Sequence, residues 1–402
     1  MSQIYANASI TLSATWAANS SDGCFVTPNK RYTSRTRTFT NSNHETYELH
    51  CHEKLPELKA PLHKRGWVFQ ERMLSKRIVH FMEQELWWEC QESFTCECRD
   101  EDHKKEVFGV EMNQSAKIAE FSSLHETQSS WERIVATYTT KSLTYPSDIF
   151  PALQGLAKLV PAIMGRYLAG HWESFLVRSL CWYVLESVAP RFRTDRSASL
   201  RWPYDEPVRV RFKEWRAPSW SWGAAQGGVG WPNFDDETEI TTYITVISAI
   251  TIPKGDDPMG QISYGAIVLR GKCLAGQIRI EQSLYSKAPD LYVVIELKEP
   301  QRHVSPKPLL CYPNWDYIDQ ENDTQVIALK ILEAVRGDPD DDEGDNHLQQ
   351  HWLILRVVEG TDGEYMRLGT IYLDDYRVKG TLAREMDALY DDQAIEMDVK
   401  II

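Results

Sequence analysis

The sequence predicts an α+β fold, in which a helix-containing N-terminal half packs on a β-rich, antiparallel C-terminal half. Helical spacing marks the first half, because Trp131, Ile134, Val135 and Tyr138 recur at intervals of three and four residues. Beyond residue 240 the apolar period changes to the alternation of strands, and clusters of Gly, Pro and Asp separate the segments. The chain also contains 14 Trp, 18 Tyr and 12 Phe, which indicates a large aromatic core or an aromatic pocket.

The first predicted region, residues 1–190, combines helices with one β-hairpin. Residues 3–19 suggest the end of a helix followed by a strand. Pro61 favours the start of a helix over 62–74, because proline suits the first helical turn. Ser129 and Glu132 have the spacing of a capping box at the start of another helix. The hairpin strands are expected at 77–81 and 86–90, and two further helices at 149–160 and 167–186.

The second predicted region, residues 191–402, consists of short strands that could form a barrel, a sandwich or a propeller-like arrangement. In the segment 240–252 the alternating residues, including Ile244, Ile250 and Ile252, should share one face. The acidic run Gly337–Asp345 is interpreted as a solvated loop. The strands are expected at 208–212, 240–252, 265–270, 276–280, 291–297, 325–332, 351–358 and 364–374.

The charge and the apolar pattern exclude several function classes. The net charge is −14, and a uniformly acidic chain repels phosphate backbones, so nucleic acid is not an expected partner. No segment approaches the ~18 consecutive apolar residues that a membrane span needs. The N-terminus resembles no secretory signal, and the eight cysteines are expected to be reduced thiols. We therefore expect a cytoplasmic protein.

Neither a metal nor a cofactor is expected. Cys90, Cys96, Cys98 and His103 could supply four zinc ligands, but their spacing differs from the C-x2-4-C pairs of common structural sites. Cys51 lies between two histidines, yet nothing in the sequence indicates a base held beside it. Dinucleotide, Walker A, nucleophile-elbow and HExxH patterns do not occur in the sequence.

Two short segments, residues 87–89 and 215–222, are rich in tryptophan. These indoles either fill the core or wall an apolar ligand pocket where the two regions meet, and both interpretations stay open. The candidate ligand-binding tryptophans are Trp67, Trp88, Trp220 and Trp222.

Four polar residues are expected beside these aromatics: Arg65, Gln70, Glu71 and Glu89. Arg65 should hydrogen-bond a carboxylate or carbonyl in the interior, and Glu71 should be paired. Breaking such a buried pair typically costs about 3–5 kcal/mol. In an enzyme, Arg65, Glu71 and Glu89 would be the catalytic candidates and Gln70 a ligand-binding residue. Arg65 would polarise a carbonyl or leaving group, and a buried carboxyl such as Glu89 would move a proton.

Several segments resemble the fungal heterokaryon-incompatibility (HET) domain family. Residues 4–14, IYANASITLSA, resemble the middle of that domain. So do residues 61–75, PLHKRGWVFQERMLS, with the core Arg-Gly-Trp-x-x-Gln-Glu, and the hairpin that follows. Segments resembling the β-rich tail common in these proteins lie at 143–148, 168–173, 217–222 and 365–372.

The resemblance implies a protein of a filamentous fungus that acts in incompatibility or cell-death signalling through contacts with other proteins. The chain departs from the family pattern in beginning at the Ile-Tyr phrase, so it is expected to lack the front half of the domain and any nucleotide site there. The alternative is a cofactor-independent enzyme of secondary metabolism. Such an enzyme, a cyclase, dehydratase or pericyclase, would bind an apolar small molecule in the tryptophan-lined pocket.

Overall fold

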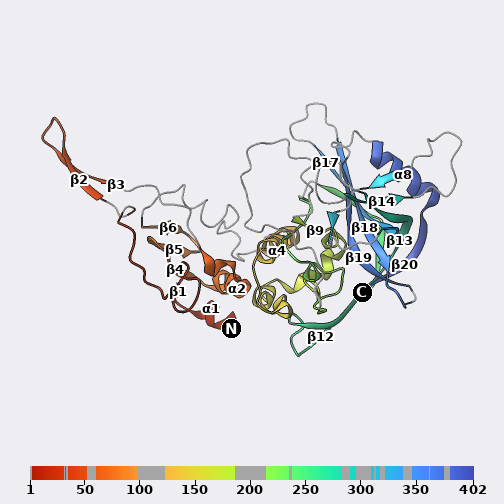
Figure 1. The fold of residues 1–402 in the computed structure, drawn as a ribbon, viewed down its shortest axis with the longest axis horizontal. Coiled ribbons are helices and arrows are strands. Elements are labelled where there is room, and N and C mark those ends of the chain that lie inside the picture. Colours follow the sequence, from red (N-terminus) through yellow and green to blue (C-terminus); the bar gives the residue numbers. More distant parts are fainter. Residues whose placement is uncertain are drawn as a thin grey trace. The chain divides into compact units, whose positions relative to one another are not determined.

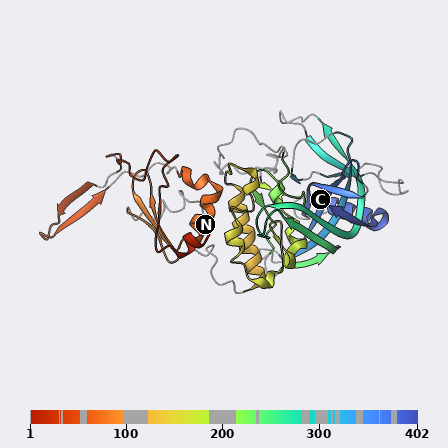
Figure 2. The same cartoon turned by 90° about the horizontal axis from the view of Figure 1, so that it is seen from below.

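The chain divides into two compact units. Unit 1 comprises Met1–Ser122, Thr140–Thr144 and Ala152–Val160, and unit 2 comprises Ser123–Thr139, Tyr145–Pro151 and Pro161–Ile402. Figures 1 and 2 show their elements from two directions. The computed structural model describes residues 2–30, 32, 35–51, 60–97, 123–185, 214–234, 238–281, 290–295, 309–311, 314–316, 322–337, 346–361, 363–374 and 381–402.

Unit 1 contains a four-stranded sheet with the strand order β1-β4-β5-β6. β1 runs parallel to β4, and the other neighbours are antiparallel. The β4–β5 pair confirms the predicted hairpin, and its alternation buries Ile78, His80, Trp87 and Glu89 on one face. The strands are β1 (Thr11–Ser13), β4 (Arg77–Phe81), β5 (Leu86–Cys90) and β6 (Phe94–Cys96).

The predicted helix over 62–74 is a 3-10 turn followed by an α-helix. Pro61 begins the turn, as its missing N–H allows. Gly66 begins the α-helix and donates its N–H to the Ser142 carbonyl at 2.8 Å. A Cβ at Gly66 would lie 2.5 Å from Leu143 Cδ2, so this close approach requires glycine. The helical elements of unit 1 are α1 (Ser2–Asn7), the 3-10 turn Pro61–Lys64, α2 (Gly66–Leu74) and α5 (Gln154–Ala157).

A second, separate sheet of unit 1 is the two-stranded hairpin of β2 (Arg35–Thr40) and β3 (Thr46–Cys51), visible in red-orange in Figure 1. Every residue of β2 is exposed. The Phe39 and Tyr47 rings lie opposite each other and stack at a centroid distance of 5.9 Å.

Unit 2 contains a ten-stranded, mostly antiparallel sheet in which five strands close on themselves. β13 pairs with both β17 and β20, and β17, β18, β19 and β20 are neighbours in that order, so the ring closes as in a barrel. Figure 2 shows the long β13 in green beside the blue C-terminal strands. The strands are β11 (Glu239–Thr242), β12 (Ile244–Pro253), β13 (Ile262–Glu281), β14 (Asp290–Ile295), β15 (Leu309–Cys311), β16 (Asn314–Trp315), β17 (Gln325–Gly337), β18 (Asn346–Val357), β19 (Glu364–Asp374) and β20 (Ile395–Ile401).

A hydrophobic cluster fills this sheet from the inside. Trp352 and Ile354 from β18 pack with Leu368 from β19, and all three are fully buried. Helix α8 (Thr381–Gln393) contributes Met386 and Tyr390 to the same cluster. Helix α8 was not among the elements predicted from the sequence.

Unit 2 also contains several smaller elements, among them the amphipathic helix α4. The helix predicted from apolar spacing is confirmed, because α4 buries Trp131, Ile134, Val135 and Tyr138. The predicted capping box is wrong: α4 begins earlier, and Glu132 is a buried mid-helix residue. The elements are α4 (Leu124–Thr139), β7 (Tyr167–Leu168), β8 (His171–Trp172), α6 (Leu176–Ser179), β9 (Tyr183–Val184), β10 (Val229–Gly230), and 3-10 turns at Pro146–Asp148, Ala162–Met164, Glu173–Phe175 and Trp222–Ala224.

The predicted helix over 167–186 is wrong. The described residues form β7, β8, a 3-10 turn, α6 and β9 instead. The chain reverses at Ala169 and Gly170, whose φ angles are +46° and +96°. A Cβ at Gly170 would lie 2.4 Å from the Trp222 ring. Because this segment is buried, apolar residues occur at most of its positions, and their spacing therefore includes the spacing typical of a helix. The helix expected over 149–160 is reduced to α5.

Two strand predictions also need correction. The strands expected at 265–270 and 276–280 form one continuous strand, β13. Gly271 and Gly276 do not mark a turn between two strands; they lie within β13, where neighbouring side chains pack closely against their backbone. The segment 240–252 is interrupted after Thr242 and contains a bulge after Val246. Its alternating residues therefore divide between faces: Ile244 is buried, whereas Ile250 and Ile252 are about half exposed. The strand expected at 208–212 lies outside the described residues.

The predicted fold class is confirmed: the chain is α+β, and its C-terminal half is an antiparallel β-rich region. The division of the chain at residue 190 stays a prediction, since residues 186–213 lie outside the described part. Among the described helices, none is long and apolar enough to cross a membrane.

Candidate functional site

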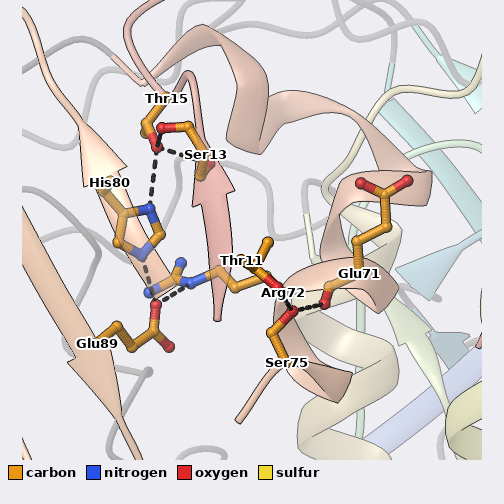
Figure 3. Close-up of polar contacts among 8 residues, drawn as sticks. All are labelled: Thr11, Ser13, Thr15, Glu71, Arg72, Ser75, His80 and Glu89. Carbon is orange, nitrogen blue, oxygen red and sulfur yellow. Dashed lines mark hydrogen bonds and ion pairs between the residues drawn. The ribbon is translucent and has the colours of Figure 1, made fainter. Parts of the chain in front are cut away.

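The candidate site is a buried polar network on the inner face of the unit 1 sheet (Figure 3). The β4–β5 register places Ile78 opposite Glu89 and His80 opposite Trp87. In the parallel β1–β4 pair, Ser13 lies beside His80, so Thr15, just beyond β1, comes within reach of the imidazole. The sheet therefore collects a carboxylate, an imidazole and hydroxyl groups on one face.

Glu89 is the centre of this network. Its Oε2 accepts hydrogen bonds from Arg72 Nε at 2.7 Å and from His80 Nε2 at 2.8 Å. Because a carboxylate can only accept, the His80 proton lies on Nε2. In the neutral ring, Nδ1 is then the acceptor for the Thr15 hydroxyl at 2.9 Å. The Ser13 hydroxyl lies 2.9 Å from that of Thr15.

A second chain of hydroxyl groups lies beside this one. Thr11 and Ser75 place their hydroxyl oxygens 2.9 Å apart, and Ser75 donates to the Glu71 carbonyl at 2.8 Å. Ser75 is the C-cap residue of α2, so these bonds fix the end of that helix against β1.

The network is almost sealed from water. The side chains of Arg72 and Glu89 are 10% and 6% exposed, and Thr15 and His80 are fully buried. The His63 ring meets the His80 ring edge-on, at a centroid distance of 5.2 Å. Burial, followed by the nearby charge of Arg72, lowers the pKa of His63 well below its ordinary value. His63 is therefore neutral, and it adds no further charge beside Arg72 and Glu89.

The order carboxylate, imidazole, hydroxyl is that of nucleophilic hydrolases, in which the imidazole takes the hydroxyl proton. A substrate atom would have to reach the Thr15 oxygen, and Thr15 is 0% exposed. In this conformation the arrangement holds α2, β1 and the β4–β5 hairpin together rather than presenting a nucleophile.

The structure separates the predicted polar residues. Arg65 is the exposed N-cap residue of α2, so the expectation that it lies in the interior is wrong. Glu71 is paired as expected, and its partner is the Tyr5 hydroxyl. Burial raises the pKa of Glu71, against the lowering effects of Tyr5 and Arg65. Burial and the adjacent Glu71 raise the pKa of Tyr5 to about 12.

Gln70 is buried, and its Oε1 accepts the Gly155 N–H at 2.5 Å. A Cβ at Gly155 would lie 2.6 Å from that oxygen, so Gln70 attaches α2 closely to α5. Of the predicted residues, Glu89 alone belongs to the buried network described above. Its partners Arg72, His80 and Thr15 were missed, although the predicted hairpin already placed His80 and Glu89 on one face.

The four candidate tryptophans lie in two different units. Trp67 and Trp88 belong to unit 1 and are partly exposed. Trp220 and Trp222 are at most 1% exposed within unit 2. Trp222 donates to the Gly170 carbonyl at 3.0 Å, and the Trp220 carbonyl accepts from another indole. Trp220 and Trp222 are thus part of the core of unit 2, and a ligand-binding role for any of the four stays a prediction.

Unit 2 also buries an ion pair that was not predicted from the sequence. Arg178 Nη2 and Glu132 Oε2 lie 3.3 Å apart, and both side chains are nearly inaccessible. Gln128 donates to Glu132 Oε1 at 2.8 Å. Burial raises the pKa of Glu132, and the adjacent Arg178 opposes this effect. The pair connects α4 to α6.

The candidate zinc ligands are only partly visible. Cys90 is partly exposed, Cys96 is buried, and both are free thiols. Cys98 and His103 lie outside the described residues. No group of three or more potential metal ligands occurs in the part of the chain that the structure describes. That the protein holds no metal stays a prediction.

Cys90 should nevertheless be a reactive thiol. Burial acts to raise its pKa, but hydrogen bonds from the Ser93 hydroxyl, the backbone of residues 92 and 93 and the Trp88 side chain lower the pKa to about 7. Since the thiolate is the nucleophile, alkylation by iodoacetamide should reach half its maximal rate near pH 7. In Ser93→Ala the pH at which Cys90 is alkylated at half its maximal rate should move toward 9. Peptide mass spectrometry measures the alkylation of Cys90 in the wild type and in this variant, with the buried Cys96 as internal reference. An unchanged midpoint in Ser93→Ala would contradict this assignment.

These features define an α+β protein of two units whose first unit contains a buried carboxylate–imidazole–hydroxyl network. Residues 1–71 match the family model described as Heterokaryon incompatibility protein (HET), which confirms the resemblance for these residues, and the resemblance of the later segments stays a prediction. This part of the chain is therefore similar to the HET family. Thr15 and the Arg-Gly-Trp-x-x-Gln-Glu core lie within the match, and His80 and Glu89 lie beyond it. No curated protein and no solved structure matches the chain.

Proposed function

We propose that this chain acts in incompatibility or cell-death signalling of a filamentous fungus, through contacts with other proteins. The match of residues 1–71 to the HET family carries this proposal. The sealed network supports it, because a fully buried Thr15 offers a substrate no reacting atom. A protein that works by contact needs an exposed surface instead of an open active site.

The β2–β3 hairpin supplies such a surface within the matched segment. Phe39 and Tyr47 are 40% and 53% exposed and stack on each other. Exposed aromatic side chains are enriched where proteins bind one another, because they bury a large area with few rotatable bonds. An isolated two-stranded hairpin is marginally stable in water, which favours a partner that covers it.

Expression of this protein in a filamentous fungus should kill hyphal compartments, and the double variant Phe39→Ser/Tyr47→Ser should reduce the dead fraction at least tenfold. The physical reason is the loss of the stacked aromatic pair from an exposed surface, which should leave the melting temperature unchanged. Vital-dye staining at equal protein levels measures the effect.

The matched control is Ile250→Ser/Ile252→Ser, which removes two exposed apolar side chains from β12 in unit 2. This control should kill as the wild type does. If both double variants reduced the fraction of dead compartments equally, the β2–β3 hairpin would not be the surface that binds the partner. Harmless expression of the wild type, at a level where it is folded, would contradict the signalling function itself.

A cofactor-independent enzyme of secondary metabolism is the second candidate. The line from Glu89 through His80 to Thr15 favours it, since these groups could pass a proton if a conformational change exposed Thr15. Titration with polycyclic and polyene compounds, followed by tryptophan fluorescence, separates the two functions. Saturable binding that Trp88→Phe weakens would favour the enzyme.

A further inference from the structure

One face of the β2–β3 hairpin combines cations with aromatic rings. Arg35, Arg37 and Phe39 alternate along β2 and therefore share a face, and Tyr47 lies opposite Phe39 on β3. We call these four residues the cationic-aromatic face. All four are exposed, and no ion pair among the described residues involves Arg35 or Arg37. Both guanidinium groups can therefore bind a partner.

The acidic residues of the hairpin lie away from this face. Between Asp22 and Glu45 the sequence contains four lysine and arginine residues and no acidic residue, although the net charge of the protein is −14. Glu45 lies between the two strands, where its Oε2 accepts a hydrogen bond from Asn41 Nδ2 at 2.8 Å. Glu48 lies opposite Thr38 and therefore on the other face. The cationic-aromatic face thus collects positive charge on an acidic protein, which favours an acidic ligand.

The second edge of β2 can accept another strand. Within the described residues, β2 pairs with β3 alone, so no strand lies along that edge. An edge without a neighbouring strand presents backbone N–H and C=O groups that an extended chain can join. The sequence of β2, RTRTFT, alternates threonine with larger side chains, and threonine favours strands. A third strand would also stabilise a hairpin that is only marginally stable as two strands.

The side chains of β2 define what such a strand must carry. Residues directly opposite each other on neighbouring strands share a face, so the joining strand meets Arg35, Arg37 and Phe39 at every second position. A carboxylate opposite each arginine can accept two parallel hydrogen bonds from its guanidinium. An apolar residue opposite Phe39 extends the contact of the aromatic pair. In an antiparallel strand, these requirements give the order apolar-x-acidic-x-acidic.

We propose that the cationic-aromatic face binds an extended acidic segment of another protein, which joins β2 as a third strand with its carboxylates opposite Arg35 and Arg37. This inference rests on the proposed function and names the chemistry of its partner. A single strand fits better than a nucleic acid or an anionic membrane, because those ligands also approach the rest of an acidic chain, which repels them.

The heptapeptide Thr-Val-Thr-Glu-Thr-Glu-Thr has the required order and tests the inference on the full chain. In the antiparallel register its valine lies opposite Phe39, its glutamates opposite Arg37 and Arg35, and its threonines opposite those of β2. The NMR signals of the isotope-labelled peptide should broaden when the 46.4 kDa protein is added, because bound peptide tumbles slowly. Binding should weaken at least tenfold between about 50 mM and about 500 mM NaCl, since salt screens charge pairs at an exposed surface.

A second peptide, Thr-Val-Glu-Thr-Glu-Thr-Thr, has the same composition and charge but carries both carboxylates one position earlier. In the same register these carboxylates lie on the other face, so this peptide should bind at least tenfold more weakly. Sliding the strand by one residue would restore the charge pairs but would move the valine away from Phe39. Equal binding of the two peptides would show that net charge alone attracts the ligand, and it would overturn the inference.

Charge reversal in the protein provides the decisive comparison. Arg35→Glu/Arg37→Glu should lose the acidic heptapeptide and instead bind the peptide in which lysine replaces both glutamates. The matched control Lys76→Glu/Lys254→Glu makes the same charge change at two other exposed residues and should bind the acidic peptide as the wild type does. All four substitutions alter exposed side chains, so the melting temperature should not change. A wild type that does not bind the acidic peptide at low salt, or equal loss in both variants, would contradict the assignment.

Three other occupants of this face have different outcomes. Vesicles of phosphatidylserine and single-stranded poly-uridine RNA are titrated against the wild type and against Arg35→Glu/Arg37→Glu. If either ligand binds the wild type more tightly than the heptapeptide does, and the variant loses it, the face binds phosphate groups and the inference is wrong. A wild type that dimerises in sedimentation velocity, with a monomeric Arg35→Glu/Arg37→Glu variant, would make the occupant a second copy and would also overturn it.

The peptide titration and the expression experiment can fail separately. If the acidic peptide binds in the expected register but expression kills no hyphae, the binding surface holds and the signalling function fails. If expression kills hyphae and the acidic peptide does not bind, the signalling function holds and its partner is not an acidic strand on β2.

Discussion

Replacing Arg367 with methionine should lower the free energy of unfolding by about 3–5 kcal/mol, because it leaves a buried carboxylate without its cation. Arg367 and Asp316 are 0% and 1% exposed. Arg367 Nε donates to Asp316 Oδ2 at 2.8 Å, and its terminal nitrogens donate to the carbonyls of Leu180 and Trp182 at 2.8 and 2.5 Å. The guanidinium carbon also lies 3.5 Å from the centroid of the Trp182 ring.

Two comparisons test the cause of this loss. The double variant Arg367→Met/Asp316→Leu should recover part of the stability, since it also removes the stranded carboxylate. It should not recover all of it, because the two carbonyls still lose a charged donor. Arg270→Met removes an arginine from an exposed pair with Asp398 and should leave the unfolding free energy nearly unchanged.

Urea denaturation followed by tryptophan fluorescence measures these differences, and Trp182 should report the loss of the stacked guanidinium directly. A double variant less stable than Arg367→Met would show that the stranded carboxylate does not cause the loss. Equal losses in Arg270→Met and Arg367→Met would show that burial of the pair contributes nothing.

Local patterns predicted the parts of the fold that depend on neighbours in the sequence. The β4–β5 hairpin follows from alternation on either side of a short polar turn, and α4 follows from helical spacing. Helix α8 carried a similar signal, since Met386 and Tyr390 are four residues apart and both face the core. The prediction for residues 167–186 was wrong because the segment is buried on every side. Apolar residues then occur at most positions, so their spacing no longer distinguishes a helix from strands.

Closure of the barrel could not be predicted in the same way. It depends on β13 pairing with β17 along one part of its length and with β20 along another. Nothing local in the sequence encodes which strands meet. The arginines show the same limit: Arg65 is the N-cap residue of α2 and Arg72 lies in its last turn, and only the packing decides which one reaches a buried carboxylate.

Replacing Glu89 with glutamine should lower the free energy of unfolding by about 3 kcal/mol, whereas the same change at Glu71 should cost far less. Glutamine keeps the shape and one acceptor at position 89, but it removes the charge that balances the nearly buried Arg72 and orients His80. Breaking a buried ion pair on one side is costly because the remaining charge stays desolvated. The largest effect is therefore expected at Glu89 and not at the Arg65–Glu71 pair that the sequence suggests.

Glu71→Gln is the matched control, because it makes the same chemical change at the last residue of the Arg-Gly-Trp-x-x-Gln-Glu core. Burial raises the pKa of Glu71, so the fold disfavours the charged carboxylate. The wild type should accordingly lose a little stability as the pH rises from below 4.5 through this raised pKa, and Glu71→Gln should remove that loss. Hydrogen exchange of the amides in residues 77–90 locates the effect in unit 1, where Glu89→Gln should speed exchange and Glu71→Gln should not. Equal and small losses in both variants would mean that the Arg72–Glu89–His80 network does not hold the sheet to α2.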